Sequence, residues 1–102
     1  MSEFVPVLAV AELPPGQAAE VTVGDRAVAV FNVGGTFHAV DNRCPHRGGP
    51  LGQGFVEGAQ VSCPWHNYTF DVTTGENVVS AELKLERYEV KVVDGQILVK
   101  VG

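Results

Sequence analysis

The sequence reads Cys44-Pro45-His46 at one point and Cys63-Pro64-Trp65-His66 further along the chain. These two stretches contain both cysteines of the protein and two of its three histidines. Each stretch therefore offers one thiolate and one imidazole on a short segment. Paired in this way, the cysteines indicate a metal site rather than a structural disulfide. The rest of the chain is expected to be a scaffold that holds the two segments face to face.

Length and composition indicate one globular domain over residues 1–102. A chain of 102 residues has room for a single core, and 45% hydrophobic with 19% charged residues is the balance of an ordinary folded domain. No apolar run approaches the ~20 residues of a membrane span, and the first residues lack the features of a secretory signal. We therefore expect a cytoplasmic protein. A net charge of −5 argues against nucleic acid as a partner.

Most of the chain has the pattern of short β-strands, so the expected fold class is all-β. Turn signals divide it at 14–16, 24–25, 34–35 and 94–95, where Pro-Pro-Gly, Gly-Asp, Gly-Gly and Asp-Gly occur. Between the turns, apolar and β-branched residues predict strands near 4–10, 21–23, 27–33, 36–40, 61–62, 68–72, 88–92 and 97–101.

Two segments depart from this strand pattern. The glycine-rich stretch 41–57 is predicted to be a long structured loop after the first motif. Residues 81–86 have room for one helical turn. The second motif is expected at the tip of a hairpin, with Cys63 and His66 in the tip and Asp71 as a turn residue beyond it. His38 lies mid-strand, away from both motifs, and is expected to be an ordinary strand residue.

Two metal sites suit two cysteines and two histidines. A structural zinc site is one, although zinc modules usually place two cysteines before two histidines and depend on the metal to fold. The other is a [2Fe–2S] cluster in which two cysteines hold one iron and two histidines hold the other. That arrangement explains why each segment supplies one ligand of each kind, and it is the favoured interpretation.

Charge counting shows what the mixed ligand set does. Two ferric ions, two sulfides and two thiolates sum to zero, and neutral imidazoles add no charge. One added electron takes such a site only to −1, whereas a cluster with four thiolates starts at −2. The histidines therefore raise the reduction potential.

The two motifs resemble the cluster-binding boxes of Rieske ferredoxins. The resemblance runs through Cys44-Pro45-His46-Arg47-Gly48-Gly49-Pro50-Leu51 and Cys63-Pro64-Trp65-His66-Asn67-Tyr68-Thr69-Phe70-Asp71, and it extends over most of the chain. It implies three small antiparallel sheets with a cluster-binding subdomain at about 42–72. It also implies that Cys44 and Cys63 hold the inner iron, and that His46 and His66 hold the outer, exposed one.

The sequence differs from the high-potential respiratory Rieske proteins that it also resembles. Gly49 and Trp65 stand where those proteins have a pair of disulfide-forming cysteines. Tyr68 and Phe70 stand where those proteins have a serine and a tyrosine that donate hydrogen bonds to the cluster. Fewer donors imply a lower potential, since hydrogen bonds stabilise the added electron. The resemblance is thus to the low-potential branch.

The family resemblance implies a carrier of single electrons with no catalytic residues of its own. Its expected partners are a flavin- and NAD(P)H-dependent ferredoxin reductase and a terminal oxygenase, as in systems that hydroxylate aromatic rings. It would dock through the edge that carries His46 and His66. One alternative is the small Rieske-like subunit of assimilatory nitrite reductase. Another is a zinc or scaffold module, for which a colourless, zinc-containing protein would be the evidence.

Overall fold

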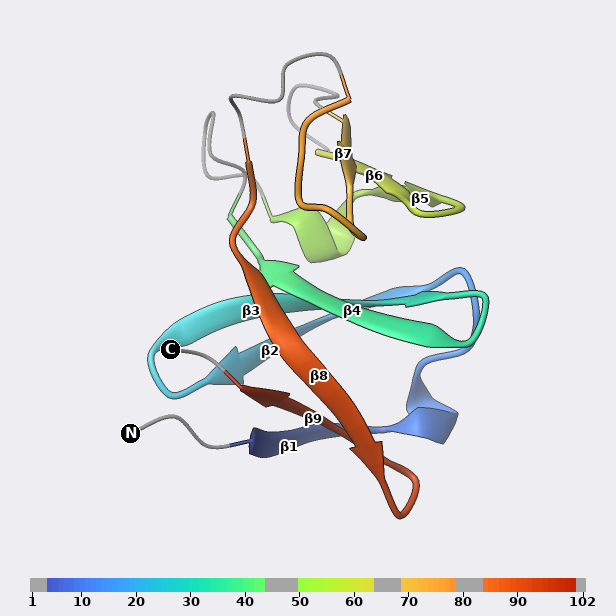
Figure 1. The fold of residues 1–102 in the computed structure, drawn as a ribbon, viewed down its shortest axis with the longest axis vertical. Coiled ribbons are helices and arrows are strands. Elements are labelled where there is room, and N and C mark those ends of the chain that lie inside the picture. The colour runs from blue at the N-terminus through green and yellow to red at the C-terminus, as the bar shows by residue number, and fades with distance from the viewer. Residues whose placement is uncertain (1–3, 44–49, 64–68, 79–83, 101–102) are drawn as a thin grey trace.

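The computed structural model describes residues 4–43, 50–63, 69–78 and 84–100. In this part of the chain, strands and two short 3₁₀ turns are the regular elements (Figure 1). Their bounds are β1 Phe4–Ala9, η1 Val10–Glu12, β2 Ala18–Val23, β3 Arg26–Val33, β4 Thr36–Asp41, η2 Leu51–Gln53, β5 Phe55–Glu57, β6 Gln60–Ser62, β7 Thr69–Asp71, β8 Arg87–Val93 and β9 Gln96–Lys100. The expectation of an all-β fold is confirmed. None of the described segments is a helix long and apolar enough to cross a membrane.

The strands form two antiparallel sheets. Six strands follow the order β1-β9-β8-β4-β3-β2, and β5-β6-β7 form a separate three-stranded sheet at the upper end of the molecule in Figure 1. Within the larger sheet, β4 and β8 share only the pairs Ala39↔Tyr88 and Val40↔Arg87. The larger sheet is therefore two three-stranded units joined at one short seam. With β5-β6-β7 they make the three small sheets that the family resemblance implied.

Local turn chemistry explains the hairpins. Asp94 and Gly95 connect β8 to β9 and have φ values of 51° and 77°. Two central residues with positive φ are what a type I′ turn requires, so this predicted turn is confirmed. Gly24 and the pair Gly34-Gly35 also have positive φ at the β2–β3 and β3–β4 connections. The strands predicted around these turns are present, with ends shifted by a few residues.

Strand β3 is buried on both faces because it lies between two hydrophobic clusters. Ala29 and Phe31 face a cluster shared with the three-stranded sheet. Val28 and Val30 point to the opposite face, into the core enclosed by the larger sheet. The alternation follows from the period of two residues in a strand. Strand β3 thus contributes side chains both to the core of the larger sheet and to the cluster that it shares with the small sheet.

Two local expectations need revision. The stretch 41–57, predicted as a loop, contains η2 and strand β5, whose residues Phe55–Glu57 pair with β6. The helical turn expected over residues 81–86 falls partly outside the described residues. Its described end is not helical, because Lys84 forms an isolated antiparallel bridge with Glu76.

Candidate metal centre

Cys63 is the one predicted ligand that the structure describes. It follows β6 directly, is fully buried, and its thiol forms no disulfide. Cys44, His46 and His66 lie outside the described residues, so the prediction of the complete ligand set stays a prediction. Within the described residues no three potential metal ligands come together.

The first motif lies between two residues that pair with each other. Arg43 and Pro50 form an isolated antiparallel bridge, and the N–H of Leu51 donates a 2.9 Å hydrogen bond to the carbonyl of Asn42. The chain therefore enters and leaves residues 44–49 at nearly the same place. We call residues 42, 43, 50 and 51 the first neck.

A buried amide secures the first neck. Asn42 Oδ1 accepts a 2.7 Å hydrogen bond from the N–H of Gly52, and Asn42 Nδ2 donates one of 2.7 Å to Glu20 Oε2 on β2. Gln53 Nε2 donates to the other oxygen of Glu20 at 2.8 Å. Hydrogen bonds from Asn42 and then from Gln53 lower the pKa of the Glu20 carboxyl. No sequence signal pointed to this group, because Glu20 lies far from both motifs along the chain.

The second motif is closed by the β6–β7 hairpin, as predicted. Ser62 pairs with Thr69, and their hydroxyl oxygens are 2.9 Å apart. Val61 and Phe70 form the next pair and are buried in the cluster that contains Cys63. Phe70 therefore belongs to the core, and it has no hydroxyl group to donate to a cluster. We call the pair Ser62–Thr69 the second neck.

The two necks lie against each other. Gly54 lies three residues beyond the first neck, and a Cβ placed on it would be 2.3 Å from the carbonyl oxygen of Ser62 and 3.1 Å from the carbonyl oxygen of Leu51. Leu51, from the first neck, shares the buried cluster with Cys63. Only glycine permits this approach of backbone to backbone. The structure thus brings the stems of both predicted ligand segments side by side.

Asp71 acts as a turn residue, as expected. Its Oδ1 accepts a 2.8 Å hydrogen bond from the N–H of Thr73, and its carbonyl accepts one of 2.7 Å from Gly75. The hydrogen bonds from Thr73, led by its hydroxyl, lower the pKa of the Asp71 carboxyl. Gly75 has a φ of 81°, and its carbonyl accepts from the N–H of Leu85 at 2.6 Å. The turn thus connects the small sheet to the segment that leads into β8.

Arg87 on β8 links the small sheet to the large one. Its Nε donates a 3.2 Å hydrogen bond to the carbonyl of Val72, and its Nη2 lies 3.5 Å from Nδ1 of His38. Burial, and next the charge of Arg87, lower the pKa of His38, while Asp71 acts in the opposite direction. His38 sits in β4 opposite Phe31, which confirms it as a strand residue.

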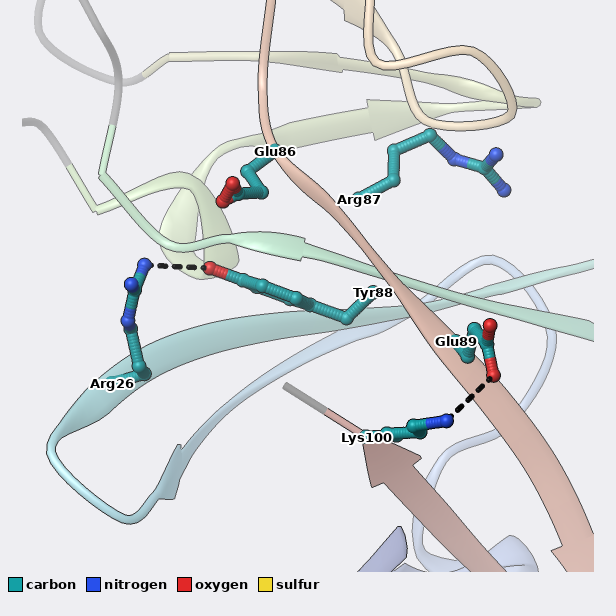
Figure 2. A pocket seen from close by; sticks show the side chains of 6 residues that line it. All are labelled: Arg26, Glu86, Arg87, Tyr88, Glu89 and Lys100. Atoms are coloured by element: carbon teal, nitrogen blue, oxygen red, sulfur yellow. Dashed lines mark hydrogen bonds and ion pairs between the residues drawn. The ribbon is translucent and has the colours of Figure 1, made fainter. Parts of the chain in front are cut away.

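A surface pocket of about 380 Å³ opens beside β8 (Figure 2). Two of its charged groups have partners within the pocket: Arg26 donates a 3.4 Å hydrogen bond to the Tyr88 hydroxyl, and Lys100 lies 3.9 Å from Glu89. Burial raises the pKa of the Tyr88 phenol. The pocket lies along the part of β8 where its pairing changes from β4 to β9.

The surroundings of Cys63 suit the inner position of an iron–sulfur cluster. A thiolate buried among Leu51, Val61 and Phe70 requires a compensating positive charge, because apolar surroundings disfavour an isolated anion. A ferric ion supplies that charge. Leu51 of the first neck packs in the same cluster as Cys63, which directly follows Ser62 of the second neck, so the described residues fit the group.

Comparisons with known proteins agree with the motifs. A family model for the Rieske [2Fe-2S] domain matches residues 3–89. The naphthalene 1,2-dioxygenase ferredoxin component of Pseudomonas aeruginosa is 31% identical over 98 residues, or 95% of this chain and 94% of the relative. A chain in a solved complex of reduced oxygenase and oxidized ferredoxin, from carbazole 1,9a-dioxygenase, is 32% identical with a TM-score of 0.85, over 94% of this chain and 91% of that one. A putative NADH-dependent nitrite reductase small subunit from Mycobacterium tuberculosis is 25% identical with a TM-score of 0.90, over 100% and 97% of the two chains.

Proposed function

This chain belongs to the Rieske [2Fe–2S] domain family, and from that premise we propose that it is a ferredoxin, a carrier of single electrons between two partner proteins. When bound, the cluster takes up and releases one electron. The protein holds that cluster and presents it, and it transforms no organic substrate itself.

The observation that carries the proposal is the burial of Cys63 beside the two necks. A buried thiolate anchors the cluster on its inner side, away from water. The remaining ligands are assigned by motif: Cys44 joins Cys63 on the inner iron, and His46 and His66 bind the outer iron. We assign residues 42–72 as the cluster-binding part of a single domain, because Asn42 closes the first neck and Val72 accepts the hydrogen bond from Arg87.

The partners follow from the systems in which its relatives work. Relatives that match nearly the whole chain are ferredoxin components of naphthalene and anthranilate dioxygenase systems. We assign an NAD(P)H-dependent flavin reductase as electron donor and a terminal oxygenase as acceptor. The protein would work in the cytoplasm, where NAD(P)H is available and cysteines remain reduced for iron.

A redox titration of the purified protein tests the proposal, with iron, sulfide and zinc measured on the same sample. We expect two irons and two sulfides per chain and a potential near the low end of the Rieske range, roughly −150 mV. A flavoprotein ferredoxin reductase with NADH should then bleach the visible absorbance. Cys63→Ser is the control, expected to bind no cluster. Zinc without sulfide in the wild-type protein would exclude electron transfer.

The small subunit of a nitrite reductase is the second candidate, favoured by the fold shared over the full chain with the protein from M. tuberculosis. In that role the chain would be a permanent subunit of an enzyme rather than a free carrier. Purification of the tagged protein from its own cells distinguishes the two. Stoichiometric recovery with a large sirohaem protein supports the subunit, whereas a free protein that passes electrons to an oxygenase supports the carrier.

A further inference from the structure

The outer face of the β5-β6-β7 sheet carries two ordered rows of side chains. Residues directly opposite each other in antiparallel strands project from the same face. Phe55, Ser62 and Thr69 are opposite one another, and Val78 extends their row because its N–H donates a 2.9 Å hydrogen bond to the carbonyl of Thr69. The hydroxyl contact between Ser62 and Thr69 confirms that the row shares one face. We call this the apolar row.

The inner face of the same sheet is already covered. Val56, Val61 and Phe70 form the intervening row, and the last two are fully buried against the large sheet. The apolar row therefore points away from the core. Phe55 is 70% exposed and Val78 is 49% exposed. A phenylalanine left this open contributes little to the stability of the fold, since burial is the source of hydrophobic stabilisation.

An acidic row runs beside the apolar one. Glu57, Gln60 and Asp71 are opposite one another, and Glu76 follows because its carbonyl accepts a 2.8 Å hydrogen bond from the N–H of Asp71. Lys84, which pairs with Glu76 at 3.7 Å, is the one cation paired with this row among the described residues. The face thus combines two exposed apolar side chains, Phe55 and Val78, with three carboxylates, so it complements a surface with an apolar recess bordered by lysine or arginine.

We propose that this outer face, centred on Phe55, is a docking surface for the terminal oxygenase. The inference rests on the proposed function and names one of its two partners. Strand β6 ends at Ser62 and β7 begins at Thr69, so the face lies at the second neck, the stem of the second motif. The oxygenase is chosen because a 32% identical chain has been solved in a complex of oxygenase and ferredoxin. An aromatic anchor within a polar rim is the usual composition of such a contact.

Photo-crosslinking identifies the occupant. A photoreactive phenylalanine analogue replaces Phe55 in the cluster-loaded protein. The labelled protein is illuminated in an extract of the cells that naturally produce this protein, and the crosslinked product is identified by mass spectrometry. The control places the analogue at Val92, which is 48% exposed on β8, away from the small sheet. A terminal oxygenase subunit captured from position 55 alone supports the proposal. Capture of the reductase alone, equal capture from both positions, or no product from position 55 overturns it.

Kinetics with the captured oxygenase, purified, provide the second test. We expect Phe55→Ser to raise the KM for the ferredoxin about tenfold, as for loss of an aromatic anchor, with Val92→Ser near wild type. The spectrum, the potential and the rate of reduction by the reductase should not change. Unchanged oxygenase kinetics in Phe55→Ser overturn the docking site while leaving the carrier function intact. Absence of a [2Fe–2S] cluster from the wild-type protein would instead refute the proposed function.

Discussion

The side-chain amide of Asn42 bridges two segments that are distant in the sequence: it donates a 2.7 Å hydrogen bond to Glu20 on β2 and accepts one of 2.7 Å from the N–H of Gly52. The first neck is thereby tied to the edge strand of the large sheet. Because Asn42 is buried, neither hydrogen bond is easily replaced by water.

Replacing Asn42 by alanine should lower the free energy of unfolding by about 1 kcal/mol, since two part-buried hydrogen bonds, from the N–H of Gly52 and to a carboxylate oxygen of Glu20, are lost. The cluster should also be released faster, because the neck next to Cys44 loosens. Urea titration and the rate of bleaching of visible absorbance measure the two effects. Gln53→Ala, which removes one exposed hydrogen bond to Glu20, is the matched control. Equal effects of the two substitutions would contradict a special role for Asn42.

Gly54→Ala should disturb the site more than the fold. The added methyl group would meet the carbonyl oxygen of Ser62 at 2.3 Å and that of Leu51 at 3.1 Å, so residue 54 must move away from both necks. We expect a protein with native β structure by circular dichroism but with much less bound iron and sulfide. Gly58→Ala in the adjacent hairpin is the control. A Cβ placed on Gly58 would meet no atom within 4 Å, and the residue has a φ of 60°. The alanine should therefore destabilise the protein only through backbone strain, by about 1 kcal/mol. A full complement of iron and sulfide in Gly54→Ala would show that the site tolerates the added methyl group, and would contradict this prediction.

His38 should make the stability fall as the pH drops from 7.5 to 5.5. Burial and the neighbouring Arg87 lower the pKa of His38 in the folded protein, against the weaker influence of Asp71. The unfolded chain therefore takes up the proton first, and each step downward in pH through this range favours unfolding. Urea midpoints across the range measure the slope. His38→Gln should flatten it, and an unchanged slope in that variant would assign the effect to other groups.

Changing His46 or His66 to cysteine should lower the reduction potential or abolish cluster binding. A thiolate in place of a neutral imidazole adds negative charge, which opposes the incoming electron. Redox titration and the visible spectrum report the change. His38→Gln, away from both motifs, should leave both unaltered. An unaltered spectrum and potential in both cysteine variants would remove His46 and His66 from the ligand set.

Several features of this protein are local enough to be predicted from sequence. The Asp94-Gly95 turn was predictable because few residue pairs tolerate two positive φ values. The all-β class followed from short runs of β-branched residues between such turns. The two motifs identified the cofactor class because thiolates and imidazoles in that order suit few metal sites.

Other features could not be predicted because they depend on contacts between distant segments. Strand β5 is only three residues long and lies between Gly54 and Gly58, and it exists because Phe55–Glu57 pair with β6. The partnership of Asn42 with Glu20 likewise arises only when β2 and the first neck are packed together.

The sequence by itself determined the strand and turn pattern and the chemistry of the two motifs, because backbone sterics and ligand type are properties of single residues and near neighbours. Only the tertiary structure decided that β3 is buried on both faces, that Gly54 lies against Ser62, and that Phe55 stands on an outward row beside carboxylates. Each of these depends on strand register and on the packing of one sheet against another. Strand register depends on which faces of the strands can be buried together, and this depends on contacts between segments that are distant in the sequence.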